Sequence, residues 1–161
     1  MEIGFIGVGK MGAPMAICLA KAGHDVRVFD TSQQALAGVA ATDGITATPT
    51  MADAVRGAGG VVTMLPDGEA VRAVVEQMAG DLAPGAVLVD MSTSYPLETQ
   101  ALRDLVPAEI GLVDAPVSGG VWRAELGQLT IITGGADADV AKVEEALGAM
   151  GSVVRQSLIH I

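Results

Sequence analysis

The stretch Gly7-Val8-Gly9-Lys10-Met11-Gly12 decides how this sequence folds, because its glycines follow the pattern G-x-G-x-x-G. An apolar run over residues 1–6 precedes it and predicts a strand, while apolar spacings of three and four over residues 10–22 predict a helix. A strand, a glycine turn and a helix in this order begin a nucleotide-binding β-α-β unit. The alternative is a tight turn without a ligand, which the flanking strand and helix disfavour.

Each glycine of this motif has its own steric task. Gly7 permits the tight turn, Gly9 lets a pyrophosphate approach the backbone, and Gly12 lets the helix pack closely on the strand. The helix offers free N–H groups and the positive end of its dipole to the phosphates. We therefore expect a dinucleotide to contact these residues of the loop: Gly7, Val8, Gly9, Met11 and Gly12.

An acidic residue, Asp30, stands where the second predicted strand ends, 23 residues after Gly7. In such folds a carboxylate here accepts hydrogen bonds from the adenosine ribose and repels a 2′-phosphate. The next residues, Thr31 and Ser32, carry no positive charge that would hold that phosphate. The sequence therefore predicts NAD rather than NADP as cofactor, with helix capping as the alternative role for Asp30.

Strands and helices alternate along the whole chain, which predicts an α/β fold with a doubly wound, mostly parallel sheet of Rossmann type. Two β-α-β-α-β halves cover residues 1–48 and 60–115. We expect one NAD-binding domain over residues 1–155 and a short tail at 156–161. The predicted strands are 1–6, 26–29, 45–48, 61–65, 86–89, 110–113, 129–133 and 152–155; the helices are 10–22, 33–41, 50–56, 67–78, 96–105 and 137–150, with an irregular segment at 115–126.

Composition excludes several classes of protein. A formal charge of −10 disfavours nucleic acid and anionic membranes as partners, and no apolar run reaches the roughly 18 residues of a membrane span. Half the residues are hydrophobic, which excludes a disordered chain. No cluster of residues has metal-ligand spacing, so we expect no metal. A single cysteine and an N-terminus without a basic leader predict a cytoplasmic protein.

Four motifs, in order, resemble the β-hydroxyacid dehydrogenases, the family of 3-hydroxyisobutyrate dehydrogenase, which is 6-phosphogluconate dehydrogenase-like. They are Gly4-Phe5-Ile6-Gly7-Val8-Gly9-Lys10-Met11-Gly12-Ala13-Pro14-Met15-Ala16, Met64-Leu65-Pro66, Asp90-Met91-Ser92-Thr93 and Asp114-Ala115-Pro116-Val117-Ser118-Gly119-Gly120. The resemblance covers residues 1–154. It implies hydride transfer between NAD and a small anionic 3-hydroxy acid, such as 3-hydroxyisobutyrate.

The resemblance also implies roles for particular residues. Leu65, Pro66 and Thr93 would lie along the cofactor, and Ser118, Gly119 and Gly120 would hold the substrate carboxylate. Successive N–H groups in a glycine turn, together with a hydroxyl, form an anion-binding concavity, which agrees with this role. The alternatives are helix capping for Ser92 and Thr93 and an ordinary loop for 118–120.

Two departures from the family concern the end of this loop. Arg123-Ala124 stands where the family usually has Gly-Ala, and Gly127-Gln128-Leu129 replaces Gly-Thr-Leu. The Arg123 side chain would either face solvent or add a cation beside an anionic substrate. Trp122 beside it would pack or form a pocket wall.

The family's catalytic lysine, in a Gly-x-x-x-Lys-x-x-x-Asn helix, has no counterpart, since these 161 residues contain no asparagine. We therefore expect no catalytic residue in this chain, and we expect the family's C-terminal helical domain to be absent. An NAD-dependent enzyme whose isolated 161 residues are inactive is the first hypothesis; a non-catalytic NAD-binding module or truncated fragment is the alternative. Apolar surface left uncovered would favour a homo-oligomer.

Overall fold

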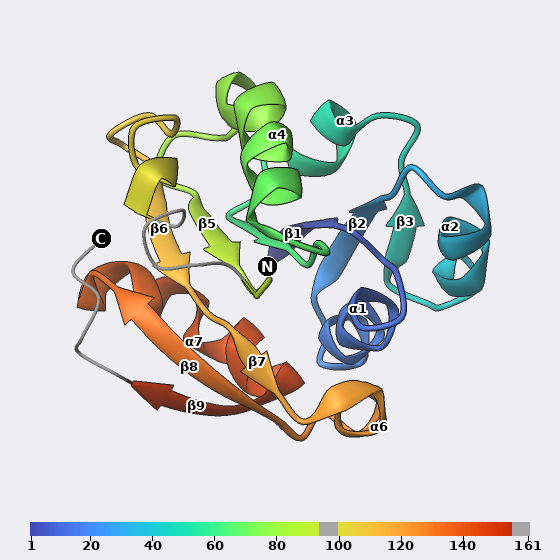
Figure 1. The fold of residues 1–161 in the computed structure, drawn as a ribbon. Helices are drawn as coiled ribbons and strands as arrows, with labels where there is room; N and C mark the ends of the chain where they lie inside the picture. The colour runs from blue at the N-terminus through green and yellow to red at the C-terminus, as the bar shows by residue number, and fades with distance from the viewer. Residues whose placement is uncertain (94–99, 156–161) are drawn as a thin grey trace.

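The computed structural model describes residues 1–93 and 100–155 of the chain (Figure 1). Nine strands form one sheet in the order β3-β2-β1-β4-β5-β6-β8-β7, with β9 paired to β8. The strands from β3 to β6 are parallel, whereas β8 is antiparallel to β6 and β7. The described strands are β1 (Glu2–Ile6), β2 (Asp25–Phe29), β3 (Ile45–Ala47), β4 (Gly60–Thr63), β5 (Val87–Asp90), β6 (Gly111–Asp114), β7 (Val117–Ser118), β8 (Leu129–Gly135) and β9 (Gly151–Arg155). The predicted mostly parallel Rossmann-type sheet is confirmed.

Helices cover both faces of this sheet, which is why strands such as β4 are buried along their whole length. Apolar side chains of α1, α2 and α7 form one core cluster on the sheet, and those of α3 and α4 belong to a second. The strands β1, β2, β3 and β4 lead in turn into α1, α2, α3 and α4, and these helices pack back on the sheet. The described helices are α1 (Gly12–Lys21), α2 (Gln33–Val39), α3 (Met51–Val55), α4 (Gly68–Met78), the short 3₁₀ helix η1 (Ala79–Asp81), α6 (Gly120–Glu125) and α7 (Asp137–Met150).

Local capping explains where several helices begin. The side chains of Ser32, Thr50 and Asp67 each accept a hydrogen bond from a backbone N–H in the first turn of α2, α3 and α4. Asp137 opens the helix predicted over 137–150 and is of a residue type that often caps helices, but it does not cap α7, because the capping position is Ala136 and Asp137 is already helical. The helix predicted over 96–105 lies partly outside the described residues; residues 100–102 are helical.

The segment expected to be irregular, residues 115–126, instead holds two short elements. The strand β7 pairs Val117 with Ile131 of β8, and α6 begins at Gly120. Between them the backbone turns sharply at Gly119 and Gly120, whose φ angles are +137° and +71°. A side chain disfavours such angles, so this turn depends on glycine.

The carboxyl ends of the parallel strands define the edge where ligands bind in open α/β sheets. The glycine loop follows β1 at this edge, Asp30 follows β2, and residues 64–66 and 91–93 follow β4 and β5. None of the described helices is both long and apolar enough to cross a bilayer.

Candidate functional site: a dinucleotide cleft at the sheet edge

A cleft of about 450 Å³ opens at the carboxyl ends of the first strands. Every residue predicted to contact the cofactor lines it except Val8, whose backbone N–H instead donates a hydrogen bond to the Asp30 carboxylate. Lys10, Thr31 and Met64 line it as well, which the sequence analysis did not foresee although each adjoins a predicted residue. The full lining is Gly7, Gly9, Lys10, Met11, Gly12, Asp30, Thr31, Met64, Leu65, Pro66 and Thr93.

The glycine loop has the shape that the motif predicts. Gly7 has a φ of +94°, and a Cβ atom there would collide with the carbonyl oxygen of Met64. A Cβ on Gly12 would collide with the carbonyl of Gly7, so helix α1 can approach the loop only because this residue lacks a side chain. By contrast, a Cβ on Gly9 would meet no atom within 4 Å, because Gly9 faces open space. The loop therefore leaves room for a pyrophosphate beside Gly9.

The Asp30 carboxylate is fixed in place by two backbone donors. The N–H of Val8 donates to Oδ2 at 2.9 Å, and the N–H of Ser32 donates to Oδ1 at 2.8 Å. These contacts join the end of β2 to the glycine loop and hold the negative charge at one end of the cleft. Each carboxylate oxygen keeps an unused lone pair, so both can still accept a hydroxyl hydrogen bond.

The loops after β4 and β5 are joined by Ser92, which belongs to the motif Asp90-Met91-Ser92-Thr93 but was not predicted to shape the cleft. Its Oγ accepts a hydrogen bond from the N–H of Leu65 at 3.0 Å, which positions one wall of the cleft. Its own N–H donates to Oδ1 of Asp90 at 3.1 Å, and Thr63 Oγ1 donates to the same oxygen at 2.8 Å. No sequence signal distinguishes this serine beyond its place at a strand end.

Two buried carboxylates lie side by side beneath this edge. Asp90 and Asp114 are register partners in β5 and β6, and only 0% and 7% of their surfaces are exposed. Burial, and to a smaller extent the nearby Asp90 carboxylate, together raise the pKa of Asp114 to about 6. The loop that begins after Asp114 leads directly to Ser118, so a titrating group stands at the base of the predicted substrate loop.

The predicted substrate residues Ser118, Gly119 and Gly120 are exposed and do not line the cofactor cleft. They form the turn between β7 and α6, and Cys18 Sγ of α1 donates to the carbonyl of Ala124 in α6 at 3.3 Å. Helix α1, whose first turn borders the cleft, thus also supports the helix that follows the substrate loop.

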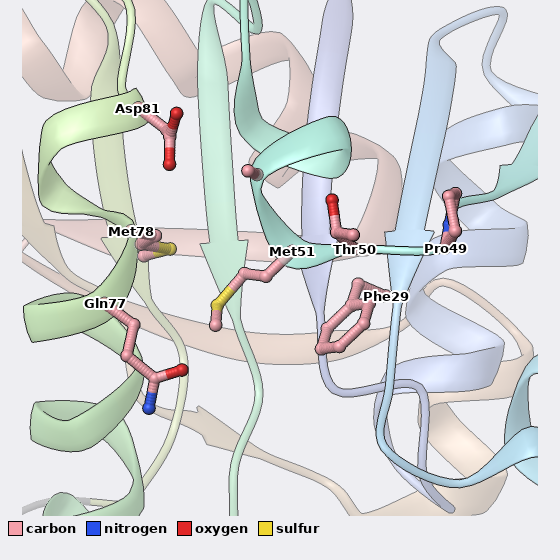
Figure 2. Close-up of a pocket in the computed structure, with 8 residues that line it drawn as sticks. Phe29, Pro49, Thr50, Met51, Gln77, Met78 and Asp81 are labelled. Atoms are coloured by element: carbon pink, nitrogen blue, oxygen red, sulfur yellow. The ribbon is translucent and has the colours of Figure 1, made fainter.

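A second cavity of about 340 Å³ lies between α3 and α4 and was not predicted (Figure 2). Its polar groups are largely engaged within the protein. Asp81 accepts a 2.8 Å hydrogen bond from Arg56, and Thr50 donates to Asp53 at 2.6 Å. The lining residues are Phe29, Pro49, Thr50, Met51, Ala52, Gln77, Met78 and Asp81.

Within residues 1–93 and 100–155 no group of three or more His, Cys, Asp or Glu side chains could hold a metal ion.

Comparisons with known proteins agree with this geometry. Residues 2–159 match the family model described as the NAD binding domain of 6-phosphogluconate dehydrogenase. The chain is 38% identical to a mitochondrial 3-hydroxyisobutyrate dehydrogenase of Drosophila melanogaster, over 95% of this chain and 48% of that protein. It is 39% identical to a 2-(hydroxymethyl)glutarate dehydrogenase of Eubacterium barkeri, over 100% of this chain and 53% of that protein.

A solved 3-hydroxyisobutyrate dehydrogenase of Mycobacterium tuberculosis, described with L-serine, has the same fold with a TM-score of 0.91. It is 34% identical, and the match covers 95% of this chain and 53% of that one. The chain thus spans about half the length of the relatives it matches. With its glycine loop, its Asp30 and its parallel sheet, the chain belongs to the family of the NAD-binding domain of 6-phosphogluconate dehydrogenase, whose relatives include 3-hydroxyisobutyrate dehydrogenases.

Proposed function

We propose that the chain is the cofactor-binding part of an oxidoreductase that moves a hydride between NAD and the hydroxyl-bearing carbon of a small 3-hydroxy acid. The observation that supports this most strongly is the cleft itself, in which Gly9 leaves open space and the Asp30 carboxylate is held in the lining by the N–H of Val8. The relatives' names, which include dehydrogenases of 3-hydroxyisobutyrate and 2-(hydroxymethyl)glutarate, supply the substrate class.

Different residues of the cleft would bind different parts of the cofactor. Backbone N–H groups between Gly9 and the start of α1 would hold the pyrophosphate, because no side chain caps this positive end of the helix dipole. Asp30 would accept hydrogen bonds from the adenosine ribose. Leu65 and Pro66 would border the cofactor, and Thr93 would contact the nicotinamide ribose. When bound there, the nicotinamide ring supplies the hydride chemistry.

The substrate would lie on the other side of the same edge. Ser118, Gly119 and Gly120 would bind its carboxylate through a hydroxyl and successive N–H groups. Oxidising an alcohol also requires that its O–H proton be removed, and a positioned base contributes about 10²–10⁴-fold to such a step. Within this chain Lys21 lies exposed at the last turn of α1 and Lys142 pairs with Asp139 at 3.3 Å, so neither is placed for that role.

We therefore expect the 161-residue chain to bind NADH but to oxidise 3-hydroxy acids very slowly. The test is a fluorescence titration with NADH, followed by assays of NADH production from 3-hydroxyisobutyrate, D-glycerate and L-serine. Turnover above about 1 s⁻¹, an ordinary enzyme rate, would contradict the expected lack of a base. Lys10, which lines the cleft, would then be the first residue to replace.

The Gly9→Val variant provides the matched control for binding. An added Cβ has free space in the protein, so this variant should keep the wild-type fold while its side chain fills the place of the pyrophosphate. We expect NADH binding to be lost with the thermal unfolding midpoint unchanged. Undiminished NADH binding by Gly9→Val would overturn the proposed position of the cofactor.

The second candidate is an NAD-binding module without any turnover of its own, because cofactor-binding residues line the cleft whereas Lys21 and Lys142 lie away from it. Assaying a longer form of the protein, should one be encoded, separates the two. Activity that appears only in the longer form supports the enzyme, and its absence from both forms supports the module. Self-association and a cytoplasmic location are further expectations of this proposal.

A further inference from the structure

Arg123 is the residue of the predicted substrate region that departs most clearly from the family pattern, which has glycine at this place. It lies in α6, three residues after Gly120, and its side chain is exposed. The turn at Gly119 brings the backbone of the substrate loop against it. A Cβ built on Gly119 would lie 2.8 Å from Cδ and 3.0 Å from Cβ of Arg123. The aliphatic part of Arg123 therefore packs directly over Gly119.

The charge of Arg123 also has no partner, in contrast to the other arginines of residues 1–93 and 100–153. Arg27, Arg56 and Arg72 form ion pairs with carboxylates, and Arg103 donates to three backbone carbonyls. No hydrogen bond or ion pair holds Arg123 within this described part of the chain. In a protein with nineteen acidic residues, a guanidinium beside the substrate loop is left free to bind an external anion.

We propose that Arg123 binds a second anionic group of the substrate, so that the preferred substrate is a 3-hydroxy acid with two anionic groups. This inference rests on the proposed function, in which Ser118, Gly119 and Gly120 already hold the first carboxylate. The guanidinium, which is always charged and presents a planar fork of donors, then faces the remainder of the substrate. A substrate with a single carboxylate leaves this donor fork unused.

Two acids form a nearly ideal pair of probes. Both 3-hydroxyisobutyrate and 2-(hydroxymethyl)glutarate carry a hydroxymethyl group and a carboxylate on the same carbon. Where 3-hydroxyisobutyrate has a methyl group on this carbon, 2-(hydroxymethyl)glutarate has a two-carbon arm that ends in a second carboxylate. An analogue whose arm ends in a neutral amide has the length of the diacid without its second charge.

Binding is measured by NMR on the full 161-residue chain, with and without saturating NADH. The indole N–H of Trp122, the chain's single tryptophan, adjoins Arg123 and gives one unambiguous signal. We expect the diacid to bind about tenfold or more tightly than the monoacid or the amide, because a charge-assisted hydrogen bond contributes roughly 1.5–3 kcal/mol, equivalent to at least tenfold in affinity.

The variants separate charge from structure. Arg123→Gln should remove the preference for the diacid and leave NADH affinity unchanged, and Arg123→Lys should restore part of the preference. Arg72→Gln, an exposed arginine of α4, serves as the matched control and should behave as the wild type.

Two results would overturn the inference: a diacid that binds wild type no more tightly than the monoacid, or a preference that survives Arg123→Gln. A wild-type chain that does not bind NADH overturns the proposed function instead. The titrations without NADH still decide the role of Arg123 in that case.

Discussion

Asp30 accepts hydrogen bonds from the N–H groups of Val8 and Ser32, and this fixes the place of a negative charge in the cleft. A 2′-phosphate in that place would be repelled, so wild type should bind NADH more tightly than NADPH. Replacing Asp30 by alanine should narrow this preference. Calorimetric titrations with both cofactors test it, with the exposed Asp43→Ala as control. Equal affinities in wild type would show that Asp30 does not select the cofactor.

The buried Asp114 gives the chain a pH-dependent stability. Its pKa is raised to about 6 in the folded state, so the folded protein holds this proton more tightly than the unfolded chain does. Its favourable contribution is therefore complete below about pH 4 and is lost as the pH rises through 6. At pH 7.5 Asp114→Asn should be more stable than wild type by roughly 2–3 kcal/mol, with little difference at pH 4.

Urea denaturation of both proteins from pH 4 to 7.5 measures this difference, and Asp43→Asn controls for a charge lost at the surface. A difference that does not grow with pH would mean that Asp114 is ionised without penalty in the folded protein.

Residues of the cleft could be predicted wherever the backbone conformation requires a particular residue type, such as glycine. Positions 7 and 12 require glycine because a side chain there would collide with a backbone carbonyl. Such requirements are visible in the sequence as the glycine motif. The role of Ser92 could not be predicted, because it depends on how two loops from separate strands meet. The same is true of the Asp90–Asp114 pair, which exists only through the register of β5 and β6.

Among the elements, α7 lacks the side-chain cap that α2, α3 and α4 have. Ala136 occupies the capping position with φ −66° and ψ 135°, angles typical of a capping residue, and it is exposed. Ala136→Ser should therefore stabilise the protein by about 0.5–1 kcal/mol, since its hydroxyl can accept a free N–H of the first turn. Thermal unfolding measures the gain, and Ala138→Ser, inside the helix, is the control. No gain at position 136 would indicate that water already satisfies these N–H groups.

Most element positions could be predicted because a buried parallel strand needs a continuous apolar run and helices show a regular apolar spacing. Residues 115–126, predicted to be irregular, instead hold β7, which has two residues, and α6, which has six. Elements this short carry too few residues to show a period. They form because β8 offers an edge to Val117 and because Gly119 and Gly120 allow the turn between them.

For the whole molecule, the exposed apolar residues of α6 predict self-association. Val121, Trp122 and Leu126 are 39%, 65% and 51% exposed, and they lie within α6 or at its C-terminal end. Such patches usually meet a partner surface. Light scattering should show a concentration-dependent oligomer that the double variant Trp122→Gln, Leu126→Gln abolishes. A wild-type chain that remains monomeric at all concentrations, with or without residues 156–161, would contradict this expectation.

The junction between β6 and β8 divides the sheet into a half that carries the glycine loop and a half that carries the turn at Gly119 and Gly120 (Figure 1). Only two residue pairs are in register across it, Val113 with Gly135 and Asp114 with Gly134, whereas β8 and β9 share five. Side chains of α7 pack in the same core cluster as residues of β6 and β8. Apolar contacts, more than backbone hydrogen bonds, therefore hold the two halves of the sheet together. Apolar burial stabilises less at low temperature. We therefore expect the two halves of the sheet to separate on cooling more readily than on heating.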